Sequence, residues 1–91
     1  MTLTGKVSFK STLRSERIIV PKLIRWQHKL ETSQILKVTV NIAGQWSNKE
    51  CYLTRMRKDG HIAIPRIVQT RLKREEPNLE GYDMDITIEP A

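Results

Sequence analysis

The sequence has little of several residue types, and each shortage excludes a class of structure. Cys51 is the only cysteine among 91 residues, so an internal disulfide and a cysteine-based metal site are both excluded. Aromatic residues make up 5% of the chain and hydrophobic residues 38%, which predicts a thin core of isoleucine, valine and leucine. A chain of this length holds one small domain, or two very small units that share a core.

Long apolar runs, targeting patterns and catalytic motifs are also missing. No apolar run is long enough to cross a bilayer, and the N-terminus lacks the basic-then-apolar pattern of a signal peptide. The sequence has no paired carboxylates, nucleophile–base motif or glycine-rich phosphate loop, and His28 and His61 have no second ligand at metal spacing. We therefore expect a cytoplasmic protein that is not an enzyme, is not in a membrane, and uses no metal or cofactor.

Basic charge is abundant and unevenly distributed. The formal net charge is +6. Residues 1–45 contain eight basic and two acidic side chains, residues 46–74 contain the same numbers, and residues 75–91 contain six acidic and no basic ones. The basic segments favour a polyanionic partner, nucleic acid before an anionic membrane surface, and the acidic segment must then point away from it. The alternative is that these charges form ordinary solvated faces.

A pattern that occurs twice organises the chain. Residues 17–25 and 61–69 each contain a short apolar run, a proline, and a basic and apolar segment. Pro21 and Pro65 are 44 positions apart (65 − 21). A proline ends a strand because it lacks an N–H, and the same residue suits the first position of a helix. Each proline therefore predicts a junction between a strand and a helix.

Alternation of apolar and polar residues predicts the strands around these junctions. The first half is expected to contain strand 6–14, a turn at Ser15–Glu16, strand 18–20, helix 21–30 and strand 36–42. The second half repeats this order with a strand from Cys51 to Lys58, a two-residue hairpin turn at Asp59–Gly60, strand 62–64, helix 65–73 and strand 84–88. At the offset of 44, Leu13 aligns with Arg57, which breaks the inward pattern unless a bulge intervenes.

Helical spacing predicts which side chains of the two helices face inward. In the first helix, Trp26 is expected to pack beside Leu23 and Leu30. The inward residues are expected to be Leu23, Ile24, Gln27 and Leu30 in the first helix and Ile67, Val68 and Leu72 in the second.

The unit of strand, tight turn, strand, Ile-x-Val/Ile-Pro junction, helix and strand resembles the AbrB/SpoVT/MazE family of swapped-hairpin DNA-binding domains. Residues 59–66 resemble its turn-Gly-Arg-apolar-apolar-Ile-Pro-Lys signature, and residues 81–86 resemble its Gly-Asp strand entry, with Tyr82 intruding. The resemblance implies a mainly β fold with two short helices. It implies a single domain, 1–91, in which tandem AbrB-like swapped-hairpin units (about 6–43 and 50–89, joined by a short turn at 44–49) form one interlocked pseudo-dimeric β-barrel.

The resemblance also implies duplex-DNA binding, by a transcription regulator or a small chromatin-like protein associated with the nucleoid. The family's contact positions correspond to Lys10, Arg17 and Arg25 in the first copy, and to Thr54 (beside Arg55), His61 and Gln69 in the second. The first copy is therefore expected to contribute more. The predicted contacts to phosphates and groove are Lys10, Arg14, Arg17, Lys22, Arg25, Arg55, Arg57, Lys58 and Arg66.

Other partners follow from the same sequence. The family often assembles further, which implies a homodimer of pseudo-dimeric chains as an additional state. A second hypothesis is an antitoxin, or another interaction module, that holds a toxin-like protein partner. A third is a small β-barrel that binds RNA.

Overall fold

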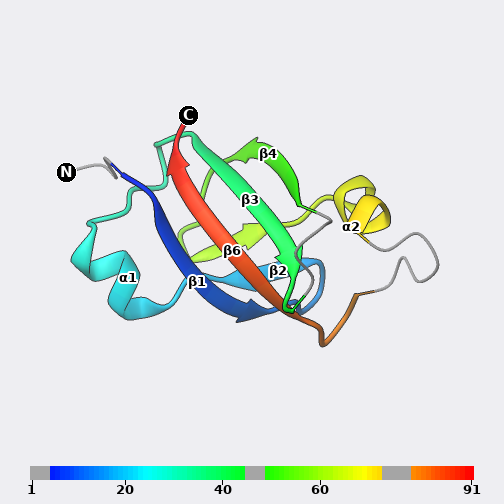
Figure 1. Cartoon of the computed structure of the whole chain (residues 1–91). Helices are drawn as coiled ribbons and strands as arrows, with labels where there is room; N and C mark the ends of the chain where they lie inside the picture. Colours follow the sequence, from blue (N-terminus) through cyan, green and yellow to red (C-terminus); the bar gives the residue numbers. More distant parts are fainter. Residues whose placement is uncertain (1–4, 45–48, 73–78) are drawn as a thin grey trace.

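The computed structural model describes residues 5–44, 49–72 and 79–91, and these form a mainly β protein with two short helices, as predicted (Figure 1). The predicted joint at 44–49 and the polar loop at 74–78 lie almost entirely outside the described residues. In the described part, no helix is long and apolar enough to span a membrane. The elements are, in chain order, β1 (Val7–Thr12), β2 (Arg17–Ile19), α1 (Lys22–Gln27), β3 (Leu36–Ile42), β4 (Glu50–Thr54), β5 (His61–Ala63), α2 (Arg66–Leu72) and β6 (Asp83–Pro90).

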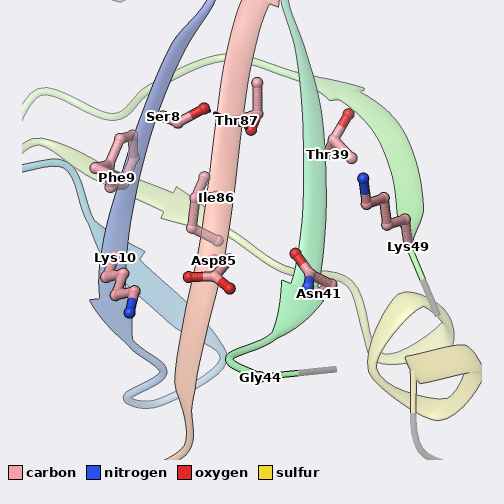
Figure 2. Close-up of a pocket in the computed structure, with 10 residues that line it drawn as sticks. All are labelled: Ser8, Phe9, Lys10, Thr39, Asn41, Gly44, Lys49, Asp85, Ile86 and Thr87. Atoms are coloured by element: carbon pink, nitrogen blue, oxygen red, sulfur yellow. Dashed lines mark hydrogen bonds between the residues drawn. The ribbon is translucent and has the colours of Figure 1, made fainter. Parts of the chain in front are cut away.

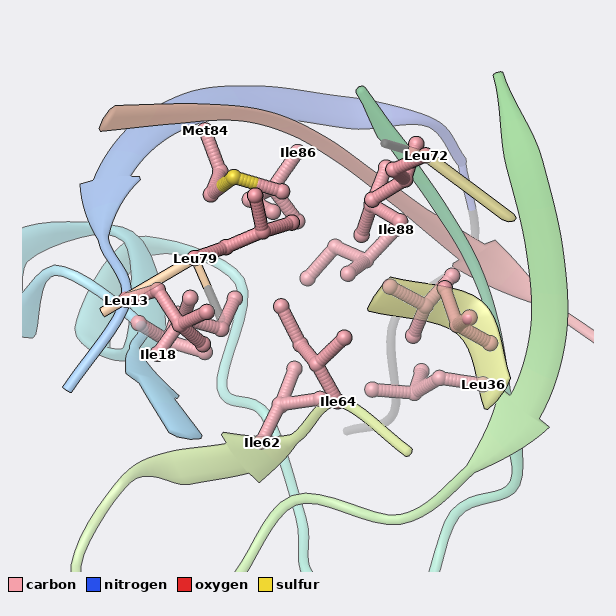
Figure 3. Close-up of a cluster of buried hydrophobic side chains, with 14 of the residues drawn as sticks. Leu13, Ile18, Leu36, Ile62, Ile64, Leu72, Leu79, Met84, Ile86 and Ile88 are labelled. Carbon is pink, nitrogen blue, oxygen red and sulfur yellow. The ribbon is translucent and has the colours of Figure 1, made fainter. Parts of the chain in front are cut away.

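The strands form two antiparallel sheets that face each other across the core. One sheet has the order β1-β6-β3-β4, and the other pairs β2 with β5. Figure 3 shows Ile86 and Ile88 entering the core from the first sheet and Ile18 and Ile62 entering it from the second. Every buried hydrophobic side chain of the described residues is Leu, Ile, Val or Met, which confirms the predicted aliphatic core. The pairings of the described strands do not close into a ring, so the expected barrel is represented by two facing sheets.

In the described part of the chain, every pair of strands joins the first half to the second. The pairs are β1 with β6, β2 with β5, β3 with β4, and β3 with β6. Exchanging β1 for β4, β2 for β5 and β3 for β6 turns this set of pairs into itself. The register follows the same exchange, because Thr39 lies opposite Thr87 and Ile18 lies opposite Ile62. The halves are interleaved, and neither has a paired sheet of its own.

The register corrects the expected correspondence between the first strands of the two halves. Phe9 lies opposite Ile86 on β6, and Tyr52 lies opposite Val38 on β3. Phe9 therefore corresponds to Tyr52, an offset of 43 (52 − 9), and Leu13 corresponds to Met56. Leu13 and Met56 are both buried, with 1% and 5% of their surface exposed. The alignment of Leu13 with Arg57 was wrong, and the inward pattern continues in the second half.

The extra residue of the second half lies in its turn. The first turn has two residues, Ser15 and Glu16, between mutual backbone hydrogen bonds of Arg14 and Arg17 at 2.8 and 2.9 Å. The second turn has three residues, 58–60, because the Arg57 amide donates to the carbonyl of His61 at 2.8 Å. A three-residue hairpin loop needs a left-handed residue at its end, and Gly60 supplies it with φ +82°. The two-residue turn expected at 59–60 was therefore wrong.

The helices bury fewer residues than their spacing predicted. None of the six residues of α1 is buried, and Leu23 and Trp26 are 60% and 78% exposed. In α2, Val68 and Leu72 are buried as expected, but Ile67 is 60% exposed. In each helix a single position along, Ile24 after Leu23 and Val68 after Ile67, faces the core instead. The predicted packing of Trp26 and the inward orientation of Leu23, Gln27 and Ile67 were wrong.

Candidate nucleic-acid interface

The ribbon of β2 and β5 carries one turn at each end. The first turn precedes β2 and the second precedes β5, and the two strands are antiparallel, so the turns lie at opposite ends. Ile18 and Ile62 are fully buried beneath the ribbon. Because side chains alternate along a strand, the neighbours of these two residues lie on the outer face. The outer face of the ribbon therefore consists of Arg17, Ile19, His61 and Ala63.

Each turn is held by the other half of the chain. The amide of Val20 donates to the carbonyl of Gly60 at 2.8 Å, and the amide of Ile64 donates to the carbonyl of Glu16 at 2.9 Å. Val20 and Ile64 are the residues that precede the two prolines. As a consequence, α1 begins beside the second turn and α2 begins beside the first turn. Each end of the ribbon thus combines a turn from one half with a helix from the other.

The second-turn end carries four basic side chains. Lys58 lies in the turn and Arg57 precedes it, and Lys22 and Arg25 come from α1. The Nε atom of Arg25 donates to the carbonyl of Val20 at 3.1 Å, and its guanidinium packs against Gly60. We use the name second-turn end for this group, which comprises Lys22, Arg25, Arg57, Lys58, Asp59 and Gly60.

Arg25 and the corresponding residue of the second half have the same structural role. Gln69, the corresponding residue of α2, donates from Nε2 to the carbonyl of Ile64 at 2.9 Å. The two side chains therefore make the same contact with the residue before the proline. Gln69 is buried, whereas Arg25 is half-buried.

Asp59 is the acidic side chain of the second-turn end. Its Oδ1 atom accepts from the backbone amide of His61 at 3.2 Å and lies 3.0 Å from Nδ1 of the same residue. These hydrogen bonds, with smaller contributions from the charges of His61 and Arg17, hold the pKa of Asp59 below its ordinary value. Asp59 is therefore ionised at neutral pH.

The first-turn end has as many acidic as basic side chains. Nε of Arg66 lies 2.7 Å from Oε1 of Glu16, and this contact raises the pKa of Arg66. Oε1 of Glu80 accepts from the amide of Ser15 at 2.7 Å. We use the name first-turn end for the group of Arg14, Ser15, Glu16, Arg66 and Glu80.

Lys10 and Arg55 lie away from both turns, on the outer face of the four-stranded sheet. Lys10 is opposite Asp85 in the register, and Figure 2 shows the two side chains close together. Arg55 continues the outward-facing series of Cys51 and Leu53. By the corrected register, the position in the second half that corresponds to Lys10 is Leu53, and not Thr54 as expected. The structure thus gathers seven of the nine predicted contact residues at the ribbon and leaves these two on the opposite layer.

The outer face of the four-stranded sheet is polar and of mixed charge. The Ser8 and Thr87 hydroxyls are 2.9 Å apart, and they border a shallow groove of about 570 Å³ (Figure 2). Glu89 lies 3.9 Å from the ammonium of Lys37. The acidic residues of β6 therefore face away from the ribbon, as expected for the acidic segment.

Two acidic residues at the first-turn end were not singled out from the sequence. The sequence indicates Glu16 only as part of a turn, and Glu80 belongs to the acidic segment expected to point away from the partner. No local pattern indicates either contact, because Glu16 and Arg66 are 50 positions apart and Ser15 and Glu80 are 65 apart. Among the described residues, no three His, Cys, Asp or Glu side chains are grouped to hold a metal ion.

Comparison with known proteins identifies a similar fold. The solution structure of PHS018 from Pyrococcus horikoshii is similar to this chain, with a TM-score of 0.74 over 99% of this chain and 94% of that one. The sequence identity is 16%, so the similarity concerns the fold alone. No protein-family model matches the chain, and no match was found among curated proteins.

Proposed function

We propose that this chain is a non-enzymatic duplex-DNA-binding protein, a transcription regulator or a small chromatin-like protein. It binds through the outer face and two ends of the β2–β5 ribbon. The observation that carries the proposal is the gathering of exposed basic side chains around one short ribbon, with the acidic residues of β6 on the opposite layer. The proposed contacts are Arg14, Arg17, Lys22, Arg25, Arg57, Lys58 and Arg66.

The geometry of a two-stranded ribbon supports this use. The major groove of B-DNA admits a two-stranded β-ribbon, and arginine forms bidentate contacts with phosphates and with guanine edges. Arg17 lies on the outer face of the ribbon, opposite Ala63 and two positions from Ile19 along β2. Arg17 is thus suited to contact base edges, while the two ends contact the backbone.

The interleaved strand pairing supports a relationship with the AbrB/SpoVT/MazE family. That family implies two units whose hairpins interlock, and here every described strand pair joins the two halves. We propose that the chain is a covalent pseudo-dimer of two swapped-hairpin units, about 6–43 and 50–89. A homodimer of such chains is the corresponding higher assembly.

Titration of a fluorescent 20-base-pair duplex with the protein at several salt concentrations tests the function. Neutralising four to six phosphates predicts that log K falls with log salt at a slope of about −4 to −5. A Lys10→Ala, Lys49→Ala double variant is the matched control, because it removes two charges from the opposite layer. It should bind nearly as well as the original protein. Failure of the original protein to bind duplex DNA, or binding independent of salt, would contradict the proposal.

An exposed apolar surface on α1 favours a second candidate function, a protein-interaction module such as an antitoxin. Leu23 and Trp26 border an open hollow of about 580 Å³ together with the stems of Lys22 and Arg25. Such surfaces often mark contacts with another protein. A partner that binds the original chain and not a Trp26→Ser variant, while duplex DNA binds neither, would favour this candidate.

A further inference from the structure

The two ends of the ribbon differ at the turn residue whose carbonyl accepts from the other half of the chain. Lys22 and Arg66 are the first residues of α1 and α2, and Glu16 and Gly60 are the turn residues whose carbonyls accept from the other half. At the first-turn end, Arg66 contacts the Glu16 carboxylate at 2.7 Å. At the second-turn end the position of Glu16 is occupied by Gly60, which has no side chain. The ion pair of the first-turn end therefore has no counterpart at Lys22.

The balance of basic and acidic side chains also makes the second-turn end more positive than the first-turn end. The second-turn end has four basic side chains and one carboxylate, and that carboxylate, Asp59, is already paired with His61. Among the described residues, the first-turn end has two basic side chains, Arg14 and Arg66, and two carboxylates, and Arg17 follows the turn on the outer face of the ribbon. Among the described residues, the ion pairs found involve none of the basic side chains of the second-turn end.

We infer that the second-turn end dominates DNA binding, so that the two ends contribute unequally despite the internal twofold arrangement of the chain. This inference rests on the proposed function. It also revises the expectation that the first copy of the repeat contributes more, because the dominant end combines the second copy's turn with the first copy's helix.

Phosphate binding explains why the difference matters. Each phosphate neutralised on B-DNA contributes about 0.9 to the salt slope, which is about 8-fold in affinity at 0.1 M salt relative to 1 M. The Glu16 carboxylate already accepts from Nε of Arg66, so its negative charge offsets that of Arg66 and repels a phosphate that approaches the same guanidinium. Arg57 and Lys58 form no ion pair among the described residues, and Asp59 is the one carboxylate at their end. Two contacts at the second-turn end should therefore be worth about 60-fold in affinity.

Two double variants with equal loss of charge test the inference. Arg57→Ala with Lys58→Ala changes the second-turn end, and Arg14→Ala with Arg66→Ala changes the first-turn end. On a random-sequence 20-base-pair duplex, the second-turn variant should lose about 60-fold in affinity at 0.1 M salt and about two units of slope. The first-turn variant should lose less than about 8-fold, the equivalent of one phosphate. Circular dichroism checks that both variants are folded.

A second pair of variants tests the role of Glu16 directly. Glu16→Gln should release Arg66 and strengthen binding, and Glu31→Gln removes one carboxylate outside both turns as the matched control. Binding should tighten by several-fold more in Glu16→Gln than in Glu31→Gln. Equal losses for the two double variants, a larger loss for the first-turn variant, or equal effects of the two glutamine variants would overturn the inference while leaving DNA binding intact. Failure of the original protein to bind would instead overturn the proposed function along with the inference.

Discussion

Substitution of Gly60 by alanine tests how the two halves are held together. Gly60 has φ +82°, is buried in the second turn, and lies under the guanidinium of Arg25. A Cβ atom at this position would overlap the guanidinium, so Arg25 would have to move and lose its hydrogen bond to the carbonyl of Val20.

The magnitude follows from two terms. A non-glycine residue in the left-handed region costs about 1–2 kcal/mol. Loss of the Arg25 hydrogen bond adds about 1 kcal/mol, so Gly60→Ala should lower the free energy of unfolding by about 2–3 kcal/mol. Gly44→Ala is the matched control, because Gly44 has φ +85° and its Cβ would meet nothing within 4 Å. The control should lose only the conformational term of about 1–2 kcal/mol.

Urea unfolding followed by circular dichroism measures both losses. The difference between the two variants, about 1 kcal/mol, belongs to the contact with Arg25. In a chain that also carries Arg25→Ala, Gly60→Ala should cost no more than Gly44→Ala. Equal losses with Arg25 present, or an unchanged difference once Arg25 is removed, would refute this reasoning.

Three further predictions concern stability and are measured by the same unfolding assay. Ile62→Ala should cost about 2–5 kcal/mol because Ile62 is fully buried, whereas Ile67→Ala should change stability by less than about 0.5 kcal/mol because Ile67 is 60% exposed. Tyr52→Phe should cost about 1 kcal/mol, since the Tyr52 hydroxyl donates to the carbonyl of Ala63 at 2.8 Å. Burial raises the pKa of Tyr52 above its ordinary value, so the folded phenol stays protonated when the unfolded one ionises. The original protein should therefore lose stability above about pH 10, and the Tyr52→Phe variant should lose less.

The strands could be predicted because alternation is a local signal. Val38, Val40 and Ile42 alternate with polar residues, and β3 lies at Leu36–Ile42 as the pattern indicated. The second turn was mistaken by one residue, because an Asp-Gly pair suits both two-residue and three-residue hairpin loops. Only the hydrogen bond from Arg57 to His61 distinguishes them.

The helix faces were harder to predict because amphipathic spacing does not identify the side that meets the core. Leu23 and Trp26 are spaced as on one helix face, but α1 is six residues long and buries none of them. Ile24 takes the position nearest the core instead.

The composition of the candidate interface depends on pairing between the halves. The family resemblance implied interlocking, and the sequence identified the basic residues around each turn. The sequence did not show that α1 begins beside the second turn. That placement follows from the hydrogen bond between Val20 and Gly60. The contact of Arg66 with Glu16 has the same origin. When charges are grouped by repeat, the first copy is expected to contribute more to binding. When they are grouped by end of the ribbon, the second-turn end is the more basic.

The central claim is that DNA meets the β2–β5 ribbon and its turns, and amide chemical shifts during titration with a duplex test it most directly. Addition of a 20-base-pair duplex at low salt should shift the amides of residues 14–19 and 57–63. The larger changes should occur around the second turn. The amides of Ser8, Thr39 and Thr87, on the outer face of the four-stranded sheet, should change little. Shifts concentrated on that outer face, or no shifts at all, would contradict the account.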